Sequence, residues 1–325
     1  MNLDTLIANL DLPEEADRMY AAEDLGYAND PAGIVPLCNR LKIEPSRAVK
    51  EAILAALERI QHPQVLVAVT ELLQSDDVFI CNQAILLLAG RGAAALPHVE
   101  TILREGNDRV RKLAVDVLCR IQVPGIEELY RVALRDSNPN IVITAVEGIG
   151  ANKAKMLKAE LENIFNQSPE PMLLTAVLET LSVVGDENSL DLILGRFPEL
   201  PVVPGMLQYS VIKTVGCLGG SRHAPRIIRL LEEGNARLAQ PVVDALINLR
   251  TRVPSFQWPQ NLLDTILGLL DRNIAEVLRY QILVLLWHGQ PGDELEARLE
   301  VEVQRLKNPE LIEALEEKRS KLAAL

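Results

Sequence analysis

The sequence repeats itself about every 31 residues, and this period constrains the fold more than any other feature. The clearest copy is segment 107–121, NDRVRKLAVDVLCRI, in which aliphatic residues recur at steps of three and four. That spacing places them on one face of an α-helix. Leu118 defines a marker position, and an aliphatic residue, Val110, stands eight positions earlier. The equivalent marker residues along the chain are Leu25, Leu57, Leu88, Leu118, Ile149, Leu181, Val215, Leu246 and Leu286.

The spacing of the markers predicts the fold class. Eight consecutive markers are separated by 32, 31, 30, 31, 32, 34 and 31 residues, and the ninth follows after 40. A second apolar helical segment precedes each next marker, and breakers such as Gly106-Asn107 separate the segments. Asn107 or Asp108 is expected to cap its helix. We predict an all-α protein, a right-handed α-solenoid of about nine helical hairpins.

The repeat resembles a known family. The run Asp108-Arg109-Val110-Arg111, followed by Ala114 and Leu118, resembles the short HEAT-like repeat of phycobilisome lyases, and the likeness extends over about 12–287. It implies stacked hairpins but no particular function, because proteins with this repeat have many unrelated roles. Arg111 and Arg279 keep the family's arginine. The ladder of Asp and Arg side chains common in such repeats is expected to be broken at the pairs Val49-Lys50, Ile80-Cys81, Ile141-Val142 and Leu173-Leu174.

The repeats predict one continuous solenoid over residues 1–325. Residues 1–43 should form an N-terminal cap with the first repeat, 44–292 the further repeats, and 293–325 the C-terminal capping helices, the last beginning near Pro309. For this last helix, a tail that docks on a partner is the alternative. The insertion 251–260 contains Phe256 and Trp258, which either bind a partner or fold back onto the stack.

Composition excludes several classes of partner. With 45 acidic and 33 basic residues the net charge is -12, which argues against nucleic acid or an anionic membrane surface. No apolar run is long enough to span a membrane, and the N-terminus does not resemble a secretory signal. We therefore expect a soluble, cytoplasmic protein. The four cysteines lack close CxxC spacing and are expected to be free thiols.

The sequence offers no arrangement typical of catalysis. The four histidines, His62, His98, His223 and His288, fall in separate repeats. The chain contains no His-Glu dipeptide of the kind that binds iron in one HEAT-like enzyme family, and no phosphate-binding GxxxxGK[ST] loop. Its acidity and few aromatics disfavour the HEAT-like enzymes that excise alkylated DNA bases. We predict a protein that is not an enzyme and has no metal or cofactor.

The repeats align side chains in columns, and these give the candidate site. Two residues before the markers stand Asp116, Glu147 and Glu179, which would form an acidic ridge. Seven or six residues before the markers stand Val142, Ile143 and Leu174, which would form an apolar centre, and Tyr209 and Tyr280 stand in the same column as Ile143. Exposed apolar side chains flanked by charge are typical of a partner-binding site. Partial burial of these columns between repeats is the alternative.

Two functions are consistent with these features. The first is a non-enzymatic interaction scaffold or adaptor whose concave groove binds a basic or amphipathic segment of another protein. The second, which rests on the resemblance, is a phycobilin lyase or bilin-handling chaperone. Such a protein would need carboxylates for the pyrrole nitrogens and aromatic side chains for the ring faces, and the chain has only a few aromatics.

Overall fold

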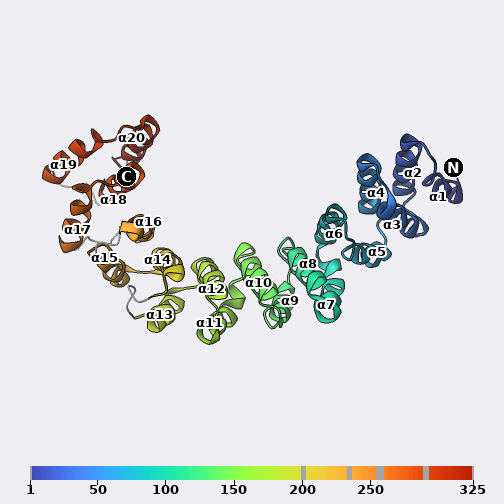
Figure 1. Cartoon of the computed structure of the whole chain (residues 1–325), viewed down its shortest axis with the longest axis horizontal. Helices are drawn as coiled ribbons and strands as arrows, with labels where there is room; N and C mark the ends of the chain where they lie inside the picture. Colours follow the sequence, from blue (N-terminus) through green and yellow to red (C-terminus); the bar gives the residue numbers. More distant parts are fainter. Residues whose placement is uncertain (1, 199–202, 233–235, 254–259, 288–292, 324–325) are drawn as a thin grey trace. The chain divides into compact units, whose positions relative to one another are not determined.

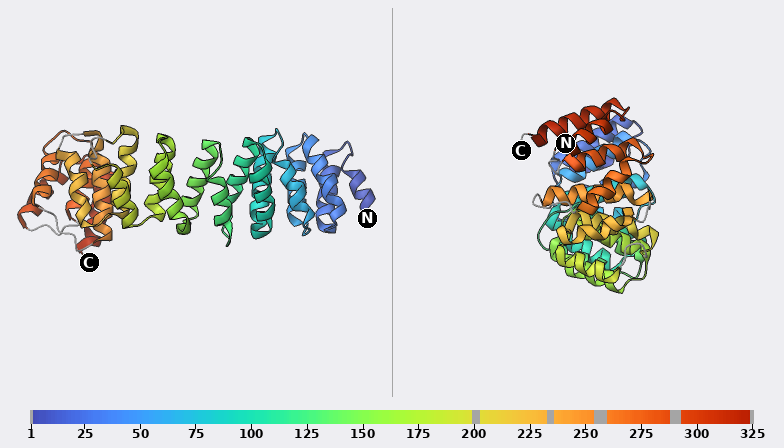
Figure 2. Two further views of the ribbon diagram at one scale, coloured as in Figure 1. Left: turned by 90° about the horizontal axis from the view of Figure 1, so that it is seen from below. Right: turned by 90° about the vertical axis from the view of Figure 1, so that its left-hand side faces the viewer.

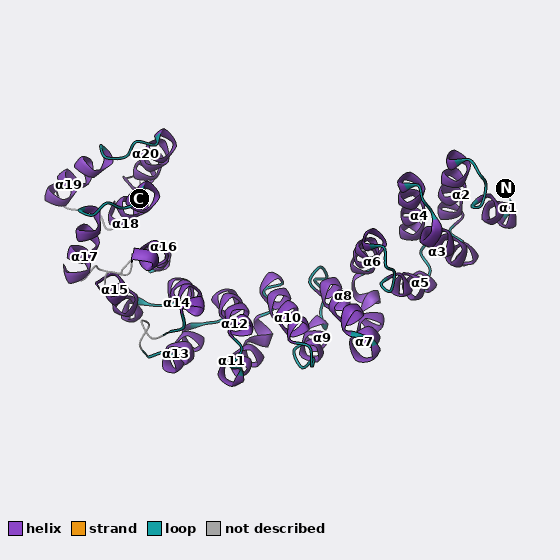
Figure 3. Ribbon diagram, in the orientation of Figure 1, coloured by secondary structure: helices purple, strands orange, loops and turns teal. Residues whose placement is uncertain are grey.

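The protein is an all-α solenoid built from helical hairpins. The computed structural model describes residues 2–198, 203–232, 236–253, 260–287 and 293–323, and within these ranges it contains helices and no strand (Figure 3). All nine marker residues are buried, each at most 1% exposed, so the helical phase inferred from the repeat is confirmed. In the described part of the chain, no helix combines the length and the apolar character that crossing a membrane requires.

Residues 1–152 form the first of two compact units. Helices α2, α4, α6, α8 and α10 carry the marker residues and are called marker helices; α3, α5, α7 and α9 form a second row beside them (Figure 1). The helices of this unit lie side by side (Figure 2). Their bounds are α1 Leu3–Asn9, α2 Glu15–Ala28, α3 Ile34–Ile43, α4 Arg47–Arg59, α5 Gln64–Leu72, α6 Val78–Gly90, α7 Leu96–Glu105, α8 Asp108–Leu118, α9 Ile126–Ala133 and α10 Pro139–Ala151.

Residues 153–325 form the second unit. Its marker helices are α12, α14, α16 and α18, and α20 packs against α18 at the end of this row. Leu315 of α20 is buried, and this helix begins at Pro309, as predicted. The bounds are α11 Lys158–Gln167, α12 Pro171–Val184, α13 Glu187–Arg196, α14 Gly205–Leu218, α15 Ala224–Glu232, α16 Ala236–Arg252, α17 Gln260–Leu270, α18 Glu276–Trp287, α19 Asp293–Val303 and α20 Pro309–Ala323. Phe256 and Trp258 lie outside the described residues.

Several helices begin at a residue whose side chain caps the first turn. Asn107 caps α8, because its Oδ1 accepts from the Val110 amide at 3.1 Å. Asp77 Oδ1 accepts from the Phe79 amide at 2.8 Å at the start of α6, and Asn138 caps α10 in the same way. Each cap satisfies an amide that the helix itself leaves free, so the breaker residues fix where each hairpin turns.

The residue after the marker controls how closely successive marker helices approach. Gly26 on α2 faces Ala56 on α4, and a Cβ added to Gly26 would lie 2.7 Å from the Ala56 Cα. The same arrangement recurs in the second unit, where a Cβ on Gly216 would lie 2.6 Å from the Ala245 Cα. Only hydrogen at this position allows such contact between helix backbones. The equivalent residues after Leu57 and Leu246 are the much larger Glu58 and Ile247.

A ladder of ion pairs joins four of the marker helices to the segment that follows each of them. The residue seven before the marker supplies the cation, and the acid stands at or near the start of the next marker helix or, in the last repeat, on α19. Arg111 Nε lies 2.7 Å from Asp136 Oδ2. The other members of the ladder are Arg18–Glu44, Lys50–Asp77 and Arg279–Glu302. The break predicted at Val49-Lys50 is wrong, because Lys50 is a cation and pairs with Asp77. The ladder lacks its cation where the sequence has Cys81, Val142, Leu174, Gln208 and Ala239. At Cys81, Arg109 from the next marker helix hydrogen bonds to the Ser75 carbonyl instead.

The first pair of the ladder is deeply buried. Glu44 has a fully covered side chain, and its carboxylate accepts from Arg18 Nε at 2.9 Å, from Arg40 Nε at 2.7 Å and from the Ser46 amide at 2.9 Å. Burial alone would raise the pKa of the Glu44 carboxyl, but the hydrogen bonds from Arg18, Ser46 and Arg40 outweigh it and lower this pKa to about 2.

We predict that Gly216→Ala destabilises the protein by about 1–3 kcal/mol, because the new methyl group meets the Ala245 backbone and α14 and α16 must move apart. Gly195→Ala on α13 is the matched control. A Cβ there meets nothing within 4 Å, so this variant should gain about 0.5–1 kcal/mol from reduced freedom of the unfolded chain. Urea unfolding followed by circular dichroism measures both. Equal effects of the two substitutions would contradict the close approach.

We predict that Glu44→Gln lowers stability at pH 7 by about 3–5 kcal/mol, because it leaves Arg18 buried without its counter-charge. The pKa of Glu44 is lower in the folded protein, at about 2, than the roughly 4.3 of an unfolded glutamate. Its contribution is therefore complete above the unfolded value and is lost as the pH falls toward 2. The difference between wild type and variant should shrink over that range. Glu51→Gln, which breaks an exposed pair with Arg47, is the control and should cost less than about 0.5 kcal/mol.

Candidate functional site

The residues predicted to form one binding face do not share one environment: some are buried in the core and others are exposed. Val142 and Leu174 are 7% and 3% exposed, so the expectation that they form an exposed apolar centre is wrong. Seven residues of helix turn the chain by nearly two full turns, so this position points within about 20° of the buried marker. Two residues turn it by about 200°, away from the core. The acidic column therefore faces outward, and Ile143 is half-buried between the two directions.

The acidic residues of the first unit remain accessible. Glu147 is exposed on α10, and Asp116 on α8 is partly exposed. The Asp116 carboxylate lies 3.3 Å from Lys112 Nζ on the same helix, an exposed pair that leaves it available to a partner. Whether these two acids bind a partner remains a prediction.

The third acid of the predicted ridge is already paired. Glu179 on α12 forms an ion pair with Lys213 on α14 and accepts from Ser210 Oγ at 3.0 Å. Hydrogen bonding to Glu179 raises the pKa of the Lys213 ammonium, which keeps the pair charged. Glu179 therefore joins neighbouring marker helices and contributes little net charge to the surface.

Tyr209 and Tyr280 line one hollow in the second unit, although they come from different marker helices. This hollow, of about 400 Å³, lies at α14, α16 and α18 and is called the tyrosine hollow. Tyr209 is 53% exposed and Tyr280 is half-buried. Its other lining residues are Lys213, Pro241, Asp244, Ala245, Ile247, Asn248, Gln281 and Val284.

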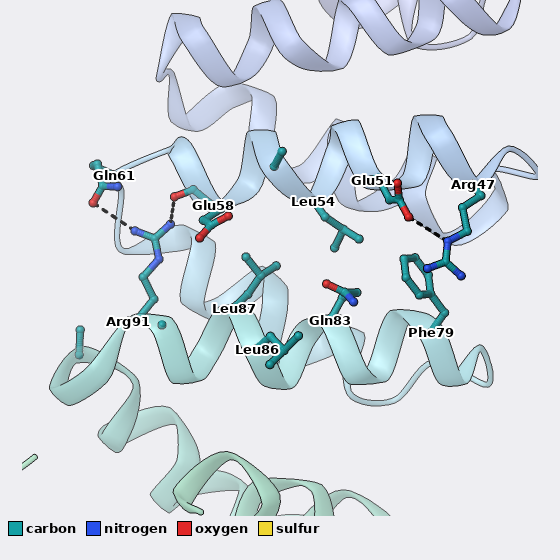
Figure 4. A pocket seen from close by; sticks show the side chains of 13 residues that line it. Arg47, Glu51, Leu54, Glu58, Gln61, Phe79, Gln83, Leu86, Leu87 and Arg91 are labelled. Carbon is teal, nitrogen blue, oxygen red and sulfur yellow. Dashed lines mark hydrogen bonds and ion pairs between the residues drawn. The ribbon is translucent and has the colours of Figure 1, made fainter. Parts of the chain in front are cut away.

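A second hollow, of about 840 Å³, lies between α4 and α6 in the first unit and is called the α4–α6 hollow. Leu54 from α4 and Gln83 and Leu87 from α6 point into the space between the helices (Figure 4). Leu86, on the same face, is 53% exposed. Glu51 and Glu58 line it from α4, and Arg47, Gln61, Gln83 and Arg91 also contribute polar groups beside the apolar side chains.

Both ends of the α4–α6 hollow are tied by arginines (Figure 4). At one end Arg91 Nη2 donates to the carbonyls of Leu57, Glu58 and Ile60 at 2.9–3.0 Å, and so caps the end of α4. At the other end the Arg47 guanidinium lies 4.2 Å from the centre of the Phe79 ring. These contacts hold α4 and α6 at a fixed separation, so the hollow is formed before any partner arrives.

The α4–α6 hollow was not predicted from the sequence, although a signal for it exists. Glu58 follows the marker Leu57, at the position where Gly26 and Gly216 allow close contact, and Leu87 precedes the next marker. Ile247 stands at the equivalent position beside the tyrosine hollow. Large side chains beside the marker therefore accompany both hollows, and this is visible only when facing positions on two repeats are compared.

The described residues carry no arrangement suited to metal binding, since no three His, Cys, Asp or Glu side chains gather there. His62, His98 and His223 lie in different repeats, and His288 falls outside the described residues. His223 is buried and closes a turn, because its Nδ1 accepts from the Gly220 amide at 2.9 Å. All four cysteines are free, as predicted, and burial raises the pKa of the Cys38 thiol to about 11. Such a thiol is un-ionised and unreactive at neutral pH.

Comparison with known proteins supports the repeat assignment. A family model described as HEAT repeats matches residues 3–90, which include the whole of α4 and α6. Among solved structures, the complex of CpcE and CpcF of phycocyanin lyase from Nostoc sp. PCC7120 is similar at 14% sequence identity and a TM-score of 0.30, over 77% of this chain and 94% of that one. That likeness is too remote to bear on function. No curated protein matches the chain in sequence.

We predict that Arg91→Met loosens the end of α4 and costs about 1–3 kcal/mol, because three carbonyl groups lose their donor. Hydrogen exchange should accelerate in the last turn of α4 and change little in α8. Arg104→Met, which removes an exposed pair with Glu100 on α7, serves as the control. Unchanged exchange in α4 would show that Arg91 does not fix this end of the hollow.

Proposed function

We propose that the protein is a non-catalytic scaffold that binds a segment of a partner protein in the α4–α6 hollow. The observation that carries this proposal is a preformed hollow between two HEAT repeats, with Leu86 exposed on its wall and glutamates at its edge. An apolar surface bordered by charge is typical of a protein interface.

The dimensions of the hollow favour a peptide segment. Each of α4 and α6 has 13 residues, so the space between them runs for about 20 Å along parallel walls. A short helix or an extended segment has this length. Because Arg47 and Arg91 already fix the walls, little conformational entropy of the scaffold is lost on binding.

Charge favours a segment that carries basic as well as apolar residues. The hollow itself is balanced, because Glu51 and Glu58 line it together with Arg47 and Arg91, so the attraction comes from the rest of the unit. Glu147 adds an exposed acid and Asp116 a partly exposed one elsewhere in the same unit, and the whole chain has a net charge of -12. A basic segment would be attracted to this unit before it contacts the apolar floor.

We predict that Leu86→Asp weakens binding of the partner at least about thirtyfold, because it places a charge on the apolar wall. Tagged wild-type protein, Leu86→Asp and Val67→Asp are each used to capture proteins from the native cell, followed by mass spectrometry. Val67 on α5 is 52% exposed, similar to Leu86, and does not line the hollow, so Val67→Asp should retain the wild-type partners.

Two outcomes of this experiment would contradict the proposal. One is that Leu86→Asp, with an unchanged circular dichroism spectrum, retains every partner of the wild type. The other is that the wild-type protein retains free bilin with a shifted absorption band and no protein partner, which would favour the bilin hypothesis.

A further inference from the structure

The tyrosine hollow carries an unbalanced negative charge. Asp244 on α16 is partly buried at its wall and accepts from the side-chain amides of Gln240 at 3.3 Å and Gln281 at 2.5 Å. These two donors are neutral, and no ion pair to Asp244 is found among the described residues. Burial raises the pKa of the Asp244 carboxyl, as expected for a desolvated acid without a cation beside it.

The cation that lines the hollow is already committed. Lys213 on α14 pairs with Glu179 on α12, and the two charges cancel. The hollow therefore has a net charge of -1 from Asp244, in surroundings where water is partly excluded and electrostatic attraction is strengthened.

The other groups of the hollow suit a planar cation. Tyr209 and Tyr280 contribute two aromatic rings, whose faces attract positive charge. The site thus combines a carboxylate with two aromatic rings.

We propose that the tyrosine hollow binds an arginine side chain of a partner protein; this inference rests on the proposed function, because it names the chemistry of a partner that such a scaffold binds. A guanidinium pairs with Asp244 and stacks on a tyrosine ring. Its planar, weakly hydrated form makes these contacts together, whereas a lysine ammonium is a strongly hydrated point charge. An aliphatic side chain would leave Asp244 desolvated and unpaired, and an acidic one would be repelled by it.

The experiment is a titration with short peptides that have one central arginine, lysine or citrulline flanked by alanines. The chain has five tyrosines, so tyrosine-selective isotope labelling gives five ring signals by NMR, and Tyr209→Phe and Tyr280→Phe identify the two of interest. The arginine peptide should shift the signals of Tyr209 and Tyr280. Citrulline has the same shape without the charge, so its peptide should bind about tenfold more weakly, and the lysine peptide should lie between them.

Asp244→Asn tests the carboxylate directly. This variant should bind the arginine peptide about tenfold more weakly, while its thermal unfolding should match or exceed that of the wild type, since a desolvated charge is removed. Asp271→Asn, which removes an exposed acid paired with Arg298 in the same unit, should bind as the wild type does.

Several results would overturn the inference. The first is that the arginine peptide shifts neither tyrosine signal at 10 mM. The second is that the citrulline or lysine peptide binds as tightly as the arginine peptide. The third is that Asp244→Asn binds the arginine peptide with unchanged affinity. A shift of the same two signals by biliverdin and not by the arginine peptide would assign the hollow to a tetrapyrrole. None of these measurements uses the α4–α6 hollow, so they can fail while Leu86→Asp still loses its partners, and the reverse also holds.

Discussion

Contact between successive marker helices is the interaction on which the rest of the structure depends. Each hairpin buries its marker residue against its neighbours, and all nine markers are at most 1% exposed. A repeat cannot bury this stripe alone, so stability comes from the interfaces between repeats. The distance across each interface is limited by the side chains beside the marker. Gly26 against Ala56 and Gly216 against Ala245 bring the helix backbones into contact at these points.

The hollows accompany departures from this close packing. In two repeats Glu58 and Ile247 occupy the position of this glycine. A hollow lies beside Glu58 at α4 and α6, and another lies beside Ile247 at α14, α16 and α18. The separation must then be held by other contacts, because a gap without partner atoms loses dispersion energy. Arg91 and the Arg47–Phe79 contact do this for the α4–α6 hollow. Tight packing and accessible surface are therefore alternatives at the same position of the repeat.

Sequence periodicity was sufficient for the helices and insufficient for the surface. It placed every marker in the core and placed Asn107 as a cap, because a helical stripe and a capping side chain are local features. It misplaced Val142 and Leu174, because a residue seven positions before a buried marker returns to nearly the same direction. The α4–α6 hollow depends on Glu58 and Leu87 from two different repeats, and no single column contains both. Phe256 and Trp258 lie outside the described residues, so their role stays a prediction.

The position of charges, rather than their sum, distinguishes the candidate sites. The repeat columns predicted an acidic ridge, yet Glu179 is paired with Lys213 and the ladder acids are paired with arginine or lysine. These pairs cost desolvation energy that their mutual attraction largely offsets, so they link repeats without attracting a partner. Asp244 differs because its donors are neutral amides. An unpaired, partly buried carboxylate remains unfavourable until a cation arrives, and the same desolvation that raises its pKa strengthens its attraction for that cation.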